Sequence, residues 1–269
     1  MDFLEKLAGA VRKNKSLVCV GLDPDPSLMP EGIGVLDFNR AIIQVTSDFA
    51  CAYKPNFAFY EALGIEGMIA LRETVKSVPA NIPVIADAKR GDIGNTAKAY
   101  ARAIFDCFGF DACTVNPYLG SDAVEPFVQY RDKMTFILCR TSNAGAADFQ
   151  SLRCETPNGT KQLYEIVAEK ASAWNQHGNV GLVVGATYPD ELKAVRARYP
   201  ETPFLIPGIG AQGGDLAFTV KNGLDKNRER TVINSSRQIL YASRGKDFAE
   251  AAGKAAKTMR DQINAVLAS

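Results

Sequence analysis

The stretch Ile82-Pro-Val-Ile-Ala-Asp87-Ala-Lys89-Arg-Gly-Asp92-Ile93-Gly-Asn-Thr96 decides the fold class of this chain. It begins as an apolar run and ends in charges and glycine, a pattern typical of a buried strand that delivers its last residues into a site. Because residues two apart on a strand point the same way, Asp87 and Lys89 are expected to share a face. Gly91 supplies a turn, Asp92 follows it, and a helix with Thr96 on an early turn comes next.

The three charged positions of this stretch allow two interpretations. An Asp-Lys-Asp array at a strand end is costly to bury unless its members pair with one another. A paired array is either a structural salt bridge at a strand–helix junction or a functional group with perturbed pKa values. Both interpretations stay open from this segment alone.

Eight apolar runs, this one included, recur along the chain. They are Ser16–Asp23, Ala50–Phe57, Ile82–Lys89, Asp111–Pro117, Met134–Thr141, Val180–Thr187, Pro203–Gly210 and Thr231–Arg237. Continuous apolar runs suit parallel strands that are covered on both faces. Helical patterns separate them, for example at residues 36–49, 159–174 and 189–199. The alternation predicts an α/β protein, a single (β/α)8 TIM barrel, with residues 1–269 as one domain.

The ends of these predicted strands carry most of the candidate functional residues. Active sites in a (β/α)8 barrel lie at the carboxyl ends of the strands. Cations and anions therefore converge on one rim, with Asp92 just beyond it. The polar and glycine-rich strand ends are Asp23, Lys54, Asp87, Lys89, Asn116, Thr141-Ser142, Gly208-Ile-Gly210 and Ser235-Ser236-Arg237.

A second signal comes from the last two strands. Pro207-Gly-Ile-Gly-Ala-Gln-Gly213-Gly214 is a glycine-rich turn, and Arg237 ends the next apolar run. Loops after strands 7 and 8 often bind phosphate in this fold through backbone N–H groups. Arg237 can add a bidentate contact to the same phosphate. The alternative is a tight turn beside an exposed arginine.

Composition narrows the classes of partner. The formal net charge is +1 and 46% of the residues are apolar. A nucleic-acid-binding protein normally carries a basic stripe, so no nucleic-acid partner is expected. No apolar stretch approaches the roughly 20 residues of a membrane span, so no membrane association is expected. Residues 1–13 are interpreted as an amphipathic helix and not as a signal peptide.

The cysteine and histidine content narrows the chemistry. None of the six cysteines forms a CxxC pair, and four lie in apolar runs, which predicts a reducing cytoplasm without disulfides or a zinc site. The sole histidine, His177, lies near the end of a helical pattern. Mechanisms of the Ser-His-Asp and Cys-His type are therefore excluded.

Residues 142–158 form the longest weakly patterned stretch. A long loop at the carboxyl end of a strand is a candidate lid over the site, and a loop without function is the alternative.

Over nearly its full length the chain resembles orotidine 5′-monophosphate decarboxylases of the longer bacterial class. The matching motifs are Gly21-Leu-Asp23, Tyr53-Lys54-Pro-Asn, Asp87-Ala-Lys89-Arg-Gly-Asp92-Ile93 with Thr96, Val115-Asn-Pro-Tyr-Leu-Gly120, Thr141-Ser142-Asn143, Pro207-Gly-Ile-Gly-Ala-Gln212 and Ser236-Arg237. The Asp-x-Lys-x-x-Asp motif is highly specific where it ends the third strand of such a barrel. One departure is Ala144, where many relatives have proline.

The resemblance implies decarboxylation of orotidine 5′-monophosphate to uridine 5′-monophosphate and CO2, without metal or cofactor, in pyrimidine biosynthesis. It implies that Lys89 protonates C6 of the pyrimidine and that Asp87 lies near the substrate carboxylate. Lys54 and Asp92 complete the charge array.

The resemblance also implies the binding residues and a homodimer. Asp92, Ile93 and Thr96 would enter the site of the neighbouring subunit. Asp23 and Lys54 would hold ribose hydroxyls, and Ser142 the pyrimidine edge. Gln212 and Arg237 would hold the phosphate, with Pro207 and Ser236 as further substrate contacts.

Two rival functions remain open on the sequence. Hexulose-6-phosphate synthase and ketogulonate-phosphate decarboxylase relatives share the barrel and the Asp-x-Lys-x-x-Asp motif but need a divalent metal. The Thr141-Ser142 and Gln212 positions favour a pyrimidine over these substrates. A phosphate-binding sensor without catalysis is the other rival, and the intact Lys89 and Asp92 argue against it.

Overall fold

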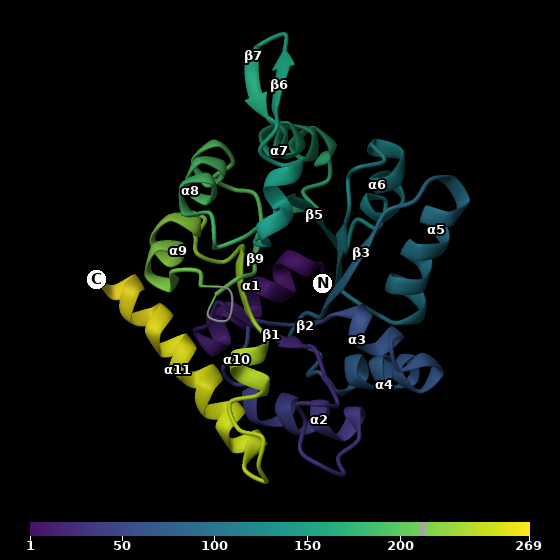
Figure 1. Ribbon diagram of the computed structural model, residues 1–269, viewed down its shortest axis with the longest axis vertical. Helices are drawn as coiled ribbons and strands as arrows, with labels where there is room; N and C mark the ends of the chain where they lie inside the picture. Colours follow the sequence, from purple (N-terminus) through teal and green to yellow (C-terminus); the bar gives the residue numbers. More distant parts are fainter. Residues whose placement is uncertain (210–212) are drawn as a thin grey trace.

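The computed structural model describes residues 1–209 and 213–269, and parallel strands form its centre (Figure 1). In chain order these strands are β1 (Val18–Leu22), β2 (Ala52–Pro55), β3 (Ile85–Arg90), β4 (Ala112–Val115), β5 (Met134–Arg140), β8 (Val180–Val184), β9 (Phe204–Ile206) and β10 (Thr231–Ser235). Neighbours follow the order β2-β1-β10-β9-β8-β5-β4-β3. Parallel bridges from Tyr53 to Val84 and from Asn56 to Asp87 join β2 to β3 and close the ring. The predicted (β/α)8 barrel is confirmed.

Helices surround this barrel (Figure 1). They are α1 (Phe3–Asn14), α2 (Val35–Thr46), α3 (Phe57–Glu61), α4 (Gly64–Ser77), α5 (Gly94–Arg102), α6 (Ser121–Val128), α7 (Leu163–Trp174), α8 (Pro189–Arg198), α9 (Leu216–Gly223), α10 (Arg237–Leu240) and α11 (Phe248–Ala268), with a π-helical turn η1 (Ala103–Cys107) after α5. Within the described residues, no helix combines the length and apolar character that a membrane crossing requires.

Several of the strands are buried along their whole length because both of their faces are covered. Every residue of β1, β8 and β10 is buried, as the continuous apolar runs predict. Helix α1 packs at the amino-terminal ends of β4 and β5. Lys6 forms an ion pair with Asp111 before β4, and Phe3 lies edge-on to Phe136 of β5 with ring centroids 5.8 Å apart. The opposite, carboxyl ends of the strands are left for the site.

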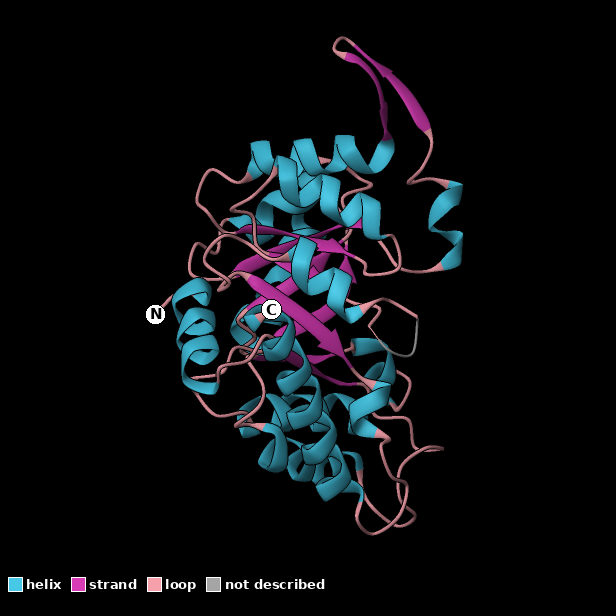
Figure 2. Cartoon of the chain, turned by 90° about the vertical axis from the view of Figure 1, so that its left-hand side faces the viewer, coloured by secondary structure: helices cyan, strands magenta, loops and turns pink. Residues whose placement is uncertain are grey.

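Residues 142–158 contain regular structure that the sequence did not indicate. A 3-10 turn η2 (Ala144–Asp148) is followed by an antiparallel hairpin of β6 (Arg153–Thr156) and β7 (Gly159–Gln162). The hairpin projects away from the barrel (Figure 2). The predicted start of a helix at residue 159 is therefore wrong. Gly159 has a φ of 97° in the hairpin turn, and Gln162 and Glu165 form the capping box that starts α7.

Candidate active site

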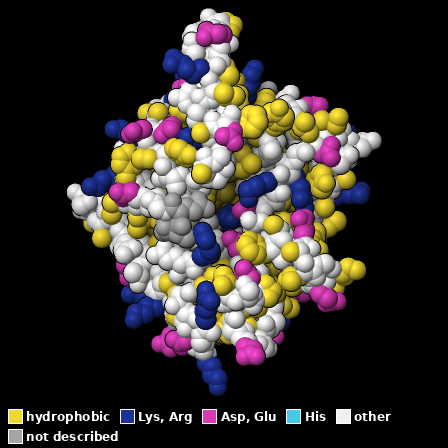
Figure 3. Space-filling view, in the orientation of Figure 1, with side chains coloured by type: hydrophobic (Ala, Val, Ile, Leu, Met, Phe, Trp, Pro, Cys, Tyr) yellow, Lys and Arg dark blue, Asp and Glu magenta, His cyan; other side chains and the backbone are white. Residues whose placement is uncertain are grey.

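A cavity of about 570 Å³ lies at the carboxyl ends of the barrel strands. Each barrel strand, or the loop directly after it, contributes to its lining. Charged side chains of both signs surround the hollow near the centre of this face (Figure 3). The predicted residues that line the cavity are Asp23, Lys54, Asp87, Lys89, Ser142, Pro207, Ser236 and Arg237. The structure therefore brings most of the predicted site together.

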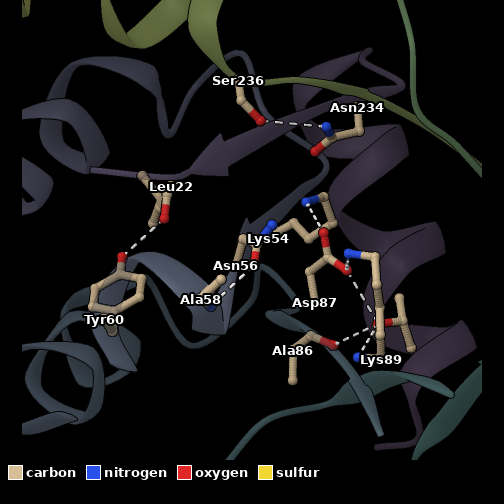
Figure 4. Close-up of polar contacts among 11 residues, drawn as sticks. Leu22, Lys54, Asn56, Ala58, Tyr60, Ala86, Asp87, Lys89, Asn234 and Ser236 are labelled. Carbon is tan, nitrogen blue, oxygen red and sulfur yellow. Dashed lines mark hydrogen bonds and ion pairs between the residues drawn. The ribbon is translucent and has the colours of Figure 1, made fainter. Parts of the chain in front are cut away.

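The centre of the cavity wall is an ion-paired array of Lys54, Asp87 and Lys89 (Figure 4). Lys54 Nζ lies 2.7 Å from Asp87 Oδ2, and Lys89 Nζ lies 2.6 Å from Asp87 Oδ1. The Lys54 side chain is 5% exposed and that of Lys89 is 49% exposed. The carboxylate thus binds a buried ammonium on one side and a solvent-facing ammonium on the other.

The charges of this array stabilise one another. Burial opposes ionisation of Asp87, but the ammonium groups of Lys54 and Lys89 outweigh it and hold the pKa of Asp87 below its ordinary value. Burial alone would lower the pKa of Lys54, but Asp87 and Asp23 outweigh it and raise the pKa of Lys54 above its ordinary value. Both groups are therefore charged at neutral pH.

Lys89 has an unusual backbone conformation. Its φ is +46°, in the left-handed region that residues with a Cβ rarely adopt, and the register with β4 shifts between Ala86 and Arg90. The Lys89 N–H donates to Thr114 Oγ1 at 3.0 Å, and Thr114 Oγ1 donates to Asp87 Oδ1 at 3.1 Å. Asp87 and Lys89 are predicted to share a face of a regular strand; their side chains do meet in an ion pair, but on an irregular strand end that neighbouring side chains stabilise.

Asp23 lies at the end of β1 in a loop that two tyrosines hold. Tyr60 donates to the carbonyl of Leu22 at 2.9 Å, and Tyr241 donates to the carbonyl of Asp23 at 2.8 Å. Asp23 Oδ1 is buried and has no hydrogen-bond partner within the described residues. Such an acceptor on a cavity wall can serve a ligand hydroxyl. Gly21 allows this arrangement, since a Cβ there would lie 1.9 Å from Ser236 Oγ.

The opposite wall comes from the ends of β9 and β10. Pro207, Ser236 and Arg237 line it, and Asn234 donates weakly to Ser236 at 3.5 Å (Figure 4). Arg237 is exposed and forms no ion pair with the described part of the chain. Gln212, predicted to bind phosphate, lies outside the described residues.

Asp92, Ile93 and Thr96 do not line this cavity in a single chain. Asp92 accepts from the N–H of Ile93 at 2.8 Å, and Ile93 is 54% exposed. Thr96 lies on the first turn of α5 and is exposed. The fourth charge of the predicted array therefore lies apart from the other three.

Several lining residues were missed by the sequence interpretation. The sequence predicts Asn116 at the rim after β4, but Asn116 Oδ1 accepts from the N–H of Tyr118 and the residue does not line the cavity. Thr114 lines it instead, and its signal was a polar residue inside an apolar run. Gln150 also lines the cavity, from the weakly patterned stretch where no spacing marks it. Arg140 at the end of β5 is 2% exposed, and its Nη1 lies 3.4 Å from Gln150 Oε1.

A sequence profile of the family described as Orotidine 5′-phosphate decarboxylase / HUMPS matches residues 16–252. The chain belongs to this family. A curated relative from Dehalococcoides mccartyi (strain CBDB1), named orotidine 5′-phosphate decarboxylase, is 59% identical over 264 residues, which cover 98% of each chain. A relative of the same name from Herpetosiphon aurantiacus is 51% identical and covers 95% of each chain.

Solved structures agree with these relatives. Leishmania donovani OMP decarboxylase superposes with a TM-score of 0.87 at 42% identity, covering 100% of both chains. The predicted family and the assignment as an orotidine 5′-phosphate decarboxylase are confirmed at this level. The roles of the individual site residues stay predictions.

Proposed function

We propose that this chain converts orotidine 5′-monophosphate to uridine 5′-monophosphate and CO2 in pyrimidine biosynthesis, without metal or cofactor, and that Lys89 is the proton donor. The observation that carries this is the Lys54–Asp87–Lys89 array on the cavity wall. Loss of CO2 leaves localised negative charge on C6, and a preorganised ammonium lowers the energy of that charge. Lys89 then transfers a proton to C6 and regains one from water.

Asp87 and Lys54 support this step in different ways. The lowered pKa keeps Asp87 ionised, so that it repels a substrate carboxylate placed beside it. That repulsion is relieved as CO2 departs. Lys54 is buried against Asp87 and holds the carboxylate in place.

Substrate binding is assigned to the residues that the sequence predicts for it. Asp23 and Lys54 hold ribose hydroxyls, and Ser142 binds the pyrimidine edge. Arg237 and Gln212 bind the phosphate, and Pro207 and Ser236 are further substrate contacts. Contacts to the phosphate, which is remote from C6, contribute to catalysis when their binding energy drives closure of the site and exclusion of water.

A homodimer with shared sites completes the proposal. Ile93, Tyr118 and Leu119 are 54%, 81% and 49% exposed, respectively. Large apolar side chains left uncovered in one chain are typical of an association surface. Asp92 and Thr96 flank Ile93 in sequence and would then reach the neighbouring subunit's site. A cytoplasmic location is also proposed, because all six cysteines are free.

The direct test follows the absorbance of orotidine 5′-monophosphate in buffer that contains a chelator. Turnover is expected to continue at the rate measured without chelator. Turnover that disappears with the chelator and returns with a divalent cation would favour a metal-dependent phosphosugar enzyme of the same family. A chain that binds the nucleotide without turning it over would be a sensor.

The shared site has its own test, which mixes Lys89→Ala and Asp92→Ala subunits. One site of each mixed dimer then takes Lys89 and Asp92 from different chains and is intact. Random pairing at equal amounts is expected to restore about a quarter of the wild-type activity. Verified mixed dimers that stay as inactive as their parents would place Asp92 in its own chain's site.

A further inference from the structure

Gln150 reaches the cavity from the segment that follows β5. Its amide Oε1 accepts from the Thr141 N–H at 2.8 Å, and its Nε2 donates to Thr141 Oγ1 at 2.8 Å. Both bonds are to the residue directly before Ser142. The side chain is half-buried and lines the cavity beside Thr141 and Ser142. Both the oxygen and the nitrogen of the Gln150 amide therefore bond to Thr141, the residue that follows β5.

The orientation of this amide is determined by its surroundings. Arg140 Nη1 lies 3.4 Å from Gln150 Oε1, so two donors face the oxygen, which leaves the nitrogen for the Thr141 hydroxyl. Arg140 is itself held. Its guanidinium lies 3.5 Å from the centre of the Tyr188 ring and 3.5 Å from Glu191 Oε1.

The backbone of Gln150 is also anchored. Its N–H donates to the carbonyl of Ala146 at 2.9 Å, and its carbonyl accepts from the N–H of Tyr164 at 3.0 Å. The first bond belongs to η2 and the second to the start of α7. The backbone of Gln150 is therefore bonded to regular structure on both sides of the hairpin.

The loop after β8 holds the same strand end from the other side. Thr187 Oγ1 donates to the carbonyl of Ser142 at 3.0 Å. Gly185 lies so close that a Cβ there would be 2.8 Å from the Ser142 nitrogen. Thr141 and Ser142 are thus held between Gln150 on one side and the Gly185–Thr187 segment on the other.

We propose that Gln150 is a positioning residue for pyrimidine recognition: it fixes Thr141 so that Ser142 meets the base in a defined place. This inference rests on the proposed function, because it takes Ser142 as the pyrimidine contact. A site that recognises a ring by hydrogen bonds to its polar groups discriminates poorly between ligands when its own polar groups are displaced. The segment 142–158 then acts as a brace for the site.

The test uses three variants and two ligands. Gln150→Met keeps the size of the side chain and removes its hydrogen bonds. Gln150→Glu keeps the acceptor that faces Thr141 and Arg140. Arg153→Ala changes an exposed residue of the same segment that does not line the cavity, and it serves as the matched control. Calorimetry measures the affinity for uridine 5′-monophosphate and for ribose 5-phosphate, and steady-state kinetics measures KM and kcat.

Gln150→Met is expected to weaken uridine 5′-monophosphate binding about tenfold, the effect of losing about 1.4 kcal/mol of hydrogen bonding. Ribose 5-phosphate binding should stay within about twofold, KM should rise more than kcat falls, and Gln150→Glu should recover most of the affinity. Arg153→Ala should match the wild type. Thermal unfolding reports whether the variant is folded. Hydrogen exchange at the Thr141 amide reports whether the bond from its N–H to residue 150 is lost.

Equal losses of affinity for the two ligands would overturn the inference. An unchanged uridine 5′-monophosphate affinity in a variant whose Thr141 amide exchanges freely would overturn it as well. If Gln150→Met fails to fold, Gln150→Glu becomes the deciding variant. It must then retain the affinity for uridine 5′-monophosphate. A wild-type chain that binds uridine 5′-monophosphate but does not decarboxylate the substrate would refute the proposed function alone and leave the role of Gln150 in place.

Discussion

The two sides of the cavity differ in how their charges are satisfied. On the side of β2 and β3, Lys54, Asp87 and Lys89 bind one another at 2.7 and 2.6 Å without any ligand. On the side of β9 and β10, Arg237 is exposed without an ion pair in the described chain, and Ser235 Oγ is buried without a hydrogen-bond partner there. One side is assembled in advance, and the other has polar groups available for a ligand.

This difference separates two contributions of charged residues. A paired and buried array affects the stability of the fold as well as the chemistry, because removing one member leaves another charge uncompensated. An exposed arginine without a partner affects stability little and acts when a ligand arrives. Substitutions on the two sides should therefore fall into two classes.

The largest effect is expected for Lys89. Lys89→Ala should lower kcat by on the order of a thousandfold or more, since it removes both the proton donor and the cation at C6. Lys89→Arg should fail as well, because a planar guanidinium does not present a compact, transferable proton. Steady-state decarboxylation measures the loss, and uridine 5′-monophosphate binding is the control for an intact site. Wild-type-like turnover in either variant would remove Lys89 from its role.

Asp87→Asn should destabilise the fold by about 3 kcal/mol, the scale of breaking a buried ion pair. The reason is that Lys54, 5% exposed, keeps its charge but loses its carboxylate partner. Denaturant unfolding at neutral pH measures the difference. Stability equal to that of the wild type would show that the array is not coupled to the fold.

The stability difference between the wild type and Asp87→Asn should depend on pH. The folded-state pKa of Asp87 is lowered, so its stabilisation is present above the unfolded pKa of about 3.9 and is lost as the pH falls toward the folded value. The stability gap between the wild type and Asp87→Asn should therefore narrow on acidification from about pH 5 to pH 2. A gap that widens in acid would contradict the assigned ion pair.

Arg237→Ala represents the other side of the cavity. It should weaken binding of uridine 5′-monophosphate by about 2 kcal/mol, while binding of the unphosphorylated nucleoside changes little. Its unfolding free energy should stay within about 0.5 kcal/mol of the wild type, in contrast to Asp87→Asn. Equal losses for nucleotide and nucleoside would show that Arg237 does not bind the phosphate.

The smallest effect is expected for Tyr241→Phe. The hydroxyl accepts from the Asp25 N–H at 2.6 Å and donates to the Asp23 carbonyl at 2.8 Å. Its loss should weaken uridine 5′-monophosphate binding by about 1 kcal/mol, through a looser Asp23, and leave the Lys54–Asp87 pair intact. Calorimetry measures the affinity. An unchanged value would show that the Tyr241 hydroxyl does not position Asp23 for the ligand.

Much of this protein follows from local pattern. The eight apolar runs determine the strands, because a parallel strand covered on both faces is apolar along most of its length. The fold in turn places the strand ends on one rim, so Asp23, Lys54, Asp87, Lys89 and Arg237 could be selected by position alone. All five line the cavity.

Other features depend on contacts between distant parts of the chain. The left-handed backbone of Lys89 is stabilised by Thr114 of the next strand, and no local signal marks it. Gln150 joins the site because η2 and α7 hold its backbone. The hairpin at 153–162 lies where the sequence predicts a loop and the start of a helix, because residues 153–156 pair with residues 159–162.

The sequence by itself therefore determined the barrel and the charges on its rim, since both depend on residue types at regular spacing. Only the tertiary structure decided which charges pair, which lie apart and which loop residue braces the site. Those outcomes depend on hydrogen bonds and close contacts between strands and loops that are distant in sequence, and spacing along the chain does not record them.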